Sequence, residues 1–362
     1  IGEKDIPGAS QAAVQCIMLG VAVSLIVSAV GIIFPEEILA LMGGEPDLIA
    51  EGAGYTQILL GGNASIMLLF LINAVFRGAG DASVAMKVLI FSNLLNILLD
   101  PLLIFGWGPI PAYGVKGAAI ATTIGRGSAV LLQLLILFMG WSKIKVGLKD
   151  VVLRAKVMLN LVKVSLGGIG QFIIGTSSWV FLMRIMAEFG SEVLAGYTIA
   201  IRVLMFTLMP SWGMSNAAAT LVGQNLGAGK PKRAESSVWK TGKYNAWFMV
   251  VVSLFYLFFA EFILKIFSDD PEVIENGALS LRVIAAGYVF YAYGMVIVQA
   301  FNGAGDTKTP TIINFFCFWV FQLPFAYAAA LYFELGVLGV LLAITFAEVL
   351  IAVISIVWFK KG

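Results

Sequence analysis

The sequence contains no histidine, and only two of its 362 residues are cysteines. Without histidine, the chain lacks imidazole acid–base catalysts, histidine-paired nucleophiles and histidine metal ligands. Cys16 and Cys317 lie far apart in apolar runs, so we interpret them as buried packing thiols rather than a disulfide. No Asp-x-x-x-Asp pair lies within or beside an apolar run, which argues against a membrane prenyl- or acyltransferase. We therefore expect neither enzymatic activity nor a cofactor.

Charged residues are also scarce. They make up 12% of the chain, about half the usual share, whereas hydrophobic residues make up 60%. The 23 basic and 21 acidic residues are too few to solvate the surface of a soluble protein of this length. A net charge of +2 gives no reason to expect a nucleic-acid partner. The composition instead predicts an integral membrane protein, with the lipid bilayer as its surroundings.

Ten apolar segments are long enough to cross a bilayer core of about 30 Å as helices. Such long continuous runs are typical of membrane helices rather than of barrel strands. The sequence therefore predicts an all-α integral membrane protein with ten transmembrane helices, at residues 12–34, 55–76, 86–107, 115–139, 158–183, 195–222, 241–262, 279–301, 310–333 and 337–359.

The connections between these segments alternate in charge. Basic residues gather at 77–87, 143–156 and 230–243, around Lys308 and at the C-terminus, whereas acidic residues gather at 36–47, 188–192 and 269–275. Because basic loops remain on the cytoplasmic side, we expect a multi-pass protein of the cell membrane with both termini in the cytoplasm.

An internal repeat divides the chain. The sequence Phe-Arg-Gly-Ala-Gly-Asp at 76–81 returns 225 residues later as Phe-Asn-Gly-Ala-Gly-Asp at 301–306. Residues 1–140 and 226–362 are thus two copies of a four-helix unit that start on the same side, which predicts a pseudo-twofold axis along the membrane normal. We expect an N-terminal lobe at 1–140, a basic cytoplasmic linker at 141–156 and a C-terminal lobe at 157–362.

Residues 157–225 have no earlier copy, so the repeat favours a parent of twelve helices in two six-helix lobes, with its first two helices missing from this sequence. A native ten-helix protein is the alternative.

Several motifs resemble the multidrug and toxic compound extrusion (MATE) family. They are Thr-Leu-Val-Gly-Gln-Asn-Leu-Gly-Ala-Gly at 220–229, the two Phe-x-Gly-Ala-Gly-Asp loops, Gly-Ala-Ala-Ile-Ala-Thr at 117–122 and Ala-Gly-Tyr-Thr-Ile-Ala at 195–200. The resemblance covers essentially the whole chain and fits helices three to twelve of the family. It implies an antiporter that expels amphipathic, often cationic organic compounds in exchange for Na+ or H+ by alternating access of its two lobes. We expect a monomer. The alternative is a flippase for lipid-linked oligosaccharides or other lipids from the same superfamily.

Asp100 is the strongest candidate for the coupling group. It lies seven residues before Trp107, roughly 10 Å below the expected outer end of its helix at 1.5 Å per residue. Asn93, Asn96 and Asp100 share one helix face, and Pro101 leaves a backbone carbonyl without its usual donor. Carboxylate, amide and carbonyl oxygens suit either a hard cation or a proton.

The family resemblance extends this candidate site. Asn96 to Pro101 matches its Asn-x-x-x-Asp-Pro motif, and Thr122 matches a threonine of the same cation-binding cluster on the next helix. That cluster also takes an aspartate from the first helix, which this sequence does not contain. From the residues alone, the alternative for Asp100 is a neutralising salt bridge with Arg126.

Two further groups of residues are candidates. Arg126 and Glu348 occupy equivalent mid-membrane positions of the two copies, as a second ionisable site or as structural polar contacts. A possible substrate cavity takes polar residues that otherwise hold helices together: Gln171, Thr176, Tyr197, Arg202, Gln299 and Asn314.

Overall fold

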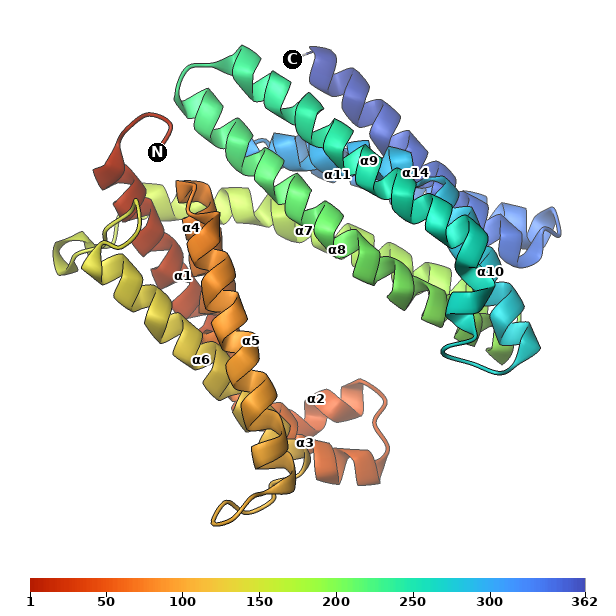
Figure 1. Cartoon of the computed structure of the whole chain (residues 1–362), viewed down its shortest axis with the longest axis horizontal. Helices are drawn as coiled ribbons and strands as arrows, with labels where there is room; N and C mark the ends of the chain where they lie inside the picture. The colour runs from red at the N-terminus through yellow and green to blue at the C-terminus, as the bar shows by residue number, and fades with distance from the viewer. Residues whose placement is uncertain (362) are drawn as a thin grey trace. The chain divides into compact units, whose positions relative to one another are not determined.

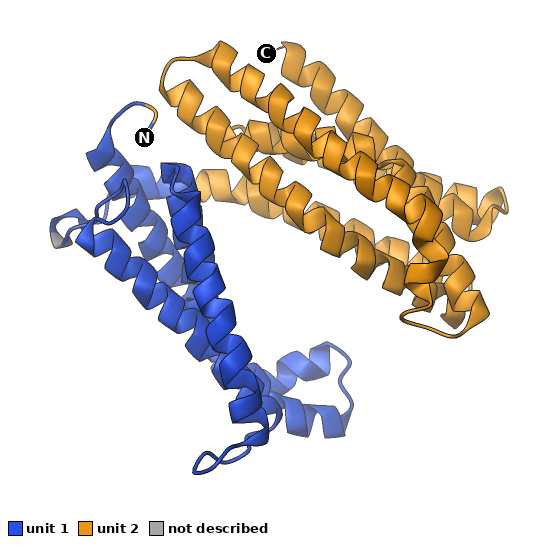
Figure 2. Cartoon of the chain, in the orientation of Figure 1, with its two compact units in different colours: residues 1, 3–161 blue, residues 2, 162–362 orange. Residues whose placement is uncertain are grey.

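The computed structural model describes residues 1–361, and helices make up most of it (Figure 1). Its contacts divide the chain into two compact units (Figure 2). Unit 1 is Ile1 with Glu3–Leu161, and unit 2 is Gly2 with Val162–Gly362. In the described residues, eight helices are long and apolar enough to cross a membrane, or ten spans if each of two bent helix pairs counts as one. The predicted all-α membrane fold is confirmed.

Unit 1 contains six α-helices and a short 3-10 turn within its described residues. They are α1 (Ile6–Ile33), α2 (Pro35–Leu41), α3 (Pro46–Gly61), α4 (Asn63–Ala79), α5 (Ala82–Phe105), α6 (Val115–Met139) and η1 (Leu148–Asp150). Proline opens α2 and α3, where its missing N–H costs no hydrogen bond. Gly80 ends α4 and Gly140 ends α6, both at positive φ. The core of the unit packs Leu69, Ile72 and Phe76 of α4 against α1, α5 and α6.

Unit 2 is built from longer helices. They are α7 (Ala155–Ala187), whose first turns belong to unit 1, then α8 (Ser191–Gly227), α9 (Pro231–Leu264), α10 (Pro271–Ala286), α11 (Tyr288–Gly303) and α14 (Gly336–Lys361). Tyr197, Tyr256 and Tyr288 are among the largest fully buried side chains, and they belong to one core cluster. The Tyr256 hydroxyl donates to the Thr207 hydroxyl at 3.0 Å.

The span between α11 and α14 is not a uniform α-helix. It runs through α12 (Lys308–Asn314), η2 (Phe315–Gln322), α13 (Leu323–Tyr327) and η3 (Ala328–Tyr332), where η2 and η3 are π-helical. Pro324 lies between the two widened stretches and withholds one backbone donor. The sequence pattern predicts a helix at 310–333 but does not predict these wider turns, which carry Phe318 and Gln322.

Two predicted spans are bent, and the bends occupy equivalent positions of the repeat. Segment 55–76 is α3 and α4, joined at Gly62 with a bend of 41°, and segment 279–301 is α10 and α11, joined at Gly287 with a bend of 56°. Gly62 and Gly287 are 225 residues apart, and their backbone torsions are −83°, 11° and −84°, −4°. A Cβ on Gly62 would lie 2.6 Å from the Thr123 methyl, and one on Gly287 would lie 2.8 Å from the Thr345 methyl. The close approach of α6 at Gly62 and of α14 at Gly287 therefore disfavours a side chain at both bends.

The basic segment after α6 packs onto unit 1. Ile144 and Val146 are 4% exposed and belong to the unit 1 core. The Asp81 carboxylate accepts hydrogen bonds from the Ser142 hydroxyl at 2.6 Å and the Lys143 backbone N–H at 2.7 Å. Gln15 of α1 donates to the Val152 carbonyl at 2.8 Å. The segment predicted as a linker is thus held by side chains from α1 and from the Phe76–Asp81 motif.

Candidate functional site: a polar cluster and a cavity

Asn96, Asp100 and Thr122 form a polar cluster between α5 and α6. The Asn96 amide group donates to the Asp100 carboxylate at 3.2 Å and to the Thr122 hydroxyl at 3.5 Å. All three residues are partly buried. One turn of α5 separates Asn96 from Asp100, and α6 supplies Thr122 from the side. Because Asn96 donates through its nitrogen, its amide oxygen stays available as a ligand beside the carboxylate and the hydroxyl.

Small residues bring the two helices of this cluster together. A Cβ on Gly125 would lie 3.2 Å from the Ser92 carbonyl oxygen and 3.3 Å from the Asn96 Cβ. The Ser92 hydroxyl donates to the Gly125 carbonyl at 3.1 Å. Nearer the loop, a Cβ on Gly117 would clash with the Leu103 carbonyl. Helices in a membrane associate closely through such small residues and interhelical hydrogen bonds.

Asn93 and Arg126 stand apart from the cluster. Asn93 is exposed, one turn before Asn96, and the hydrogen bonds of the cluster do not include it. Within residues 1–361, neither Asp100 nor Arg126 forms an ion pair, because the ion pairs found there are Lys143–Asp81 and Arg282–Glu261. The alternative of an Asp100–Arg126 salt bridge is therefore absent from this conformation. Asp100 has a hydrogen-bond donor beside it but no cationic partner.

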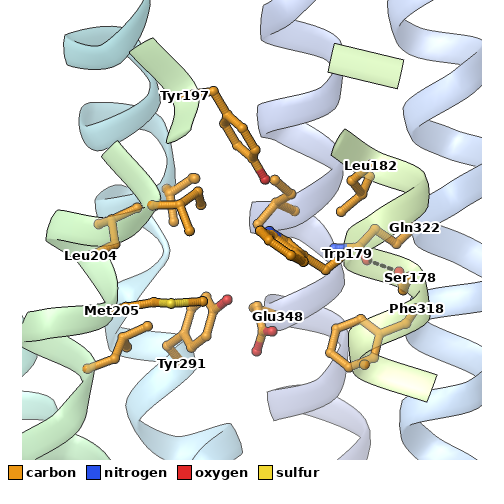
Figure 3. Close-up of a pocket in the computed structure, with 15 residues that line it drawn as sticks. Ser178, Trp179, Leu182, Tyr197, Leu204, Met205, Tyr291, Phe318, Gln322 and Glu348 are labelled. Carbon is orange, nitrogen blue, oxygen red and sulfur yellow. Dashed lines mark hydrogen bonds between the residues drawn. The ribbon is translucent and has the colours of Figure 1, made fainter. Parts of the chain in front are cut away.

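Unit 2 contains a cavity of about 180 Å³ around Glu348 (Figure 3). Helices α7, α8, α10, α11 and α14 and the π-helical η2 contribute its lining. Four aromatic side chains, Trp179, Tyr197, Tyr291 and Phe318, supply much of its wall. Glu348 is the one lining residue with an ionisable carboxyl group, and it is 8% exposed.

The polar groups of this cavity are few and ordered. The Ser178 hydroxyl of α7 donates to the Gln322 side-chain oxygen at 2.9 Å, which fixes α7 to η2 (Figure 3). The Tyr291 hydroxyl lies beside the Glu348 carboxyl group. The Tyr197 hydroxyl is buried near the Trp179 indole and has no hydrogen-bond partner of normal geometry among the described residues.

The residues predicted to line a substrate cavity are distributed over unit 2. Tyr197 lines the cavity around Glu348. Gln171 and Gln299 lie elsewhere and are linked through Asn302, which exchanges hydrogen bonds with Gln171 at 3.0 and 3.3 Å and donates to Gln299 at 3.4 Å. The three other predicted residues are outside the cavity lining: Thr176 and Arg202 are exposed, and Asn314 is partly buried.

Ser178, Tyr291 and Gln322 were not predicted as site residues. They come from α7, α11 and η2, so only the folded unit brings them to Glu348. In the sequence, each is marked only as a polar residue within an apolar run. Most such residues form hydrogen bonds between helices, so this feature does not identify a site.

Comparison with known proteins identifies the family. A family model described as MatE matches residues 1–102 and 169–328. The chain belongs to the MatE family. The probable multidrug resistance protein NorM of Thermotoga maritima is 30% identical over 320 residues, covering 88% of this chain and 68% of that protein. An FAD transporter of Shewanella oneidensis is 25% identical over 353 residues, covering 98% and 78%.

A solved structure supports the same assignment for the fold. It is described as the outward-facing conformation of a multidrug resistance MATE family transporter of the MOP superfamily, with 25% identity and a TM-score of 0.89. The match covers 99% of this chain and 80% of that chain. The resemblance found in the sequence motifs is confirmed, and this member of the MatE family is a multi-span membrane transporter.

Proposed function

We propose that this MatE-family transporter exports small amphipathic organic compounds, many of them cationic, in exchange for Na+ or H+. The Asn96–Asp100–Thr122 cluster carries this proposal, because it holds a carboxylate without a cationic partner within the membrane-spanning part of unit 1. An intramembrane carboxylate of this kind needs a proton, a cation or a paired side chain to balance its charge. The multidrug transporters among the relatives support the substrate class.

The ligands of the cluster support coupling by a small ion. Asp100 supplies a carboxylate, Asn96 an amide oxygen, Thr122 a hydroxyl and Ile97 a carbonyl whose donor Pro101 removes. Oxygen ligands of this type bind hard cations, and the carboxylate alone also takes a proton. Alternating access requires a group whose occupancy differs between two conformations of the transporter. Asp100 serves as that group when it binds the ion on one side and releases it on the other.

Transport in proteoliposomes with separately imposed gradients tests this proposal. Vesicles that hold a fluorescent cationic dye are diluted into buffers with the same dye concentration, which create a Na+ gradient, a pH gradient or neither. We expect dye movement against its own gradient under at least one ion gradient and none with protein-free vesicles. Dye movement that follows only its own gradient under every condition would refute the antiport mechanism and leave a facilitated pathway.

A further inference from the structure

Glu348 lacks a counter-charge although it is buried. No described lysine or arginine forms an ion pair with it. Its surroundings are the Tyr291 hydroxyl, the rings of Trp179 and Phe318 and the aliphatic side chains of α8 and α14 (Figure 3). A buried carboxylate is retained in a membrane protein at a large desolvation cost, so a positively charged partner or a proton has to balance it.

The size of the cavity indicates what that partner is. Its volume is about 180 Å³, whereas one water molecule takes about 30 Å³ of liquid volume and an apolar cavity of about 150 Å³ accommodates benzene. A bare metal ion would leave most of this space empty. The described residues also contain no group of three or more His, Cys, Asp and Glu residues arranged for a metal ion.

The chemistry of the walls indicates an organic cation. Trp179, Tyr197, Tyr291 and Phe318 contribute aromatic rings from four different elements, and aromatic faces attract quaternary and other ammonium groups. Tyr197, only 1% exposed, adds a hydroxyl that lacks a hydrogen-bond partner of normal geometry. Trp179 and Met205 line the cavity and remain 39% and 52% exposed, so the lining extends to the surface of the unit.

We propose that this cavity is a binding site for an organic ammonium head group, with Glu348 as its counter-ion and the four aromatic rings as its walls. The proposal rests on the proposed function in one respect: the ammonium group would belong to a transported compound. The residues that line the site belong to unit 2, whereas the Asp100 cluster belongs to unit 1.

Equilibrium binding of radiolabelled choline to the detergent-purified protein tests the site without requiring transport. We expect saturable binding, and we expect neohexyl alcohol, the uncharged carbon analogue of choline, to compete poorly. Glu348→Gln keeps the shape of the side chain and removes its charge, so it should weaken choline binding by about tenfold or more. Glu334→Gln is the matched control, because Glu334 is exposed and outside the cavity lining.

A second variant reduces the free volume of the cavity and leaves the Glu348 carboxyl group intact. Gly175 lines the cavity, and a Cβ added there would meet open space. Gly175→Leu should therefore fold normally and block choline by occupying its space. Native-like choline affinity in both Glu348→Gln and Gly175→Leu, or equal binding of neohexyl alcohol, would overturn the proposal.

The same assay separates this proposal from the transport mechanism. Asp100→Asn should keep choline binding even where gradient-driven transport is lost. If the native protein does not bind choline while it carries out ion-coupled dye efflux, the ammonium site is refuted and the proposed function stands.

Discussion

At the scale of single residues, the sequence predicts more of the polar cluster between α5 and α6 than of the cavity around Glu348. Asn96 and Asp100 are one turn apart on the same helix, and the family resemblance adds Thr122 from the next helix, where the structure places it against Asn96. Asn93 satisfies the same helical spacing, yet it is exposed and outside the hydrogen-bonded cluster. Glu348 could be singled out by its depth in an apolar run, but its neighbours could not, because most of them come from five other elements.

A glycine substitution beside the cluster tests how it is held together. Gly125→Leu places a side chain against the Ser92 carbonyl and the Asn96 Cβ, where there is no free space. We expect a loss of about 1–3 kcal/mol in stability, as for overpacking elsewhere. Gly127→Leu is the control on the same helix, since a Cβ there meets nothing within 4 Å. Thermal unfolding in detergent gives both values, and equal melting temperatures for the two variants would contradict the tight contact.

At the scale of helices, apolar length predicts spans well and predicts their interruptions poorly. The ten predicted segments correspond to eight single spans and two bent pairs in the described residues. Hydropathy does not register Gly62 or Gly287, because both bends lie within continuous apolar runs. At each bend the glycine lies against a threonine on another helix, a tertiary feature that one segment does not reveal.

The contact at the Gly287 bend predicts how substitutions at Gly287 and Thr345 change the stability of the protein. Gly287→Ala brings a methyl group to 2.8 Å from the Thr345 methyl, so it should lower the melting temperature. Thr345→Ser in the same protein removes only the opposing methyl. It keeps the hydroxyl that donates to the Val283 and Leu341 carbonyls, both at 3.1 Å. We expect the double variant to recover most of the lost stability. A double variant no more stable than Gly287→Ala alone would show that the methyl contact is not the cause.

At the scale of the whole molecule, the internal repeat accounts for the matched bends but not for the two sites. Gly80 and Gly305 have φ of 84° and 86°, as their positions in the repeated motif require. The polar cluster of unit 1 has no such copy, because the 225-residue offset of the repeat places Phe325 where unit 1 has Asp100. The two units thus share the repeated motif but differ in their carboxyl groups, with the partly buried Asp100 in unit 1 and the buried Glu348 in unit 2. We interpret this asymmetry as a division between ion coupling and substrate contact.

The most direct test of Asp100 as the coupling carboxylate is ion-driven dye efflux by the Asp100→Asn variant in proteoliposomes. Asparagine keeps the shape of the side chain and removes its charge. Because Asp100 forms no ion pair with a described residue, the change strands no buried cation. We expect normal folding and loss of gradient-driven efflux, with Asp269→Asn, an exposed loop aspartate, as the control that retains it. Adding Arg126→Gln should not restore transport. Undiminished ion-driven efflux by Asp100→Asn, or its rescue by Arg126→Gln, would contradict the assignment of Asp100 as the coupling carboxylate.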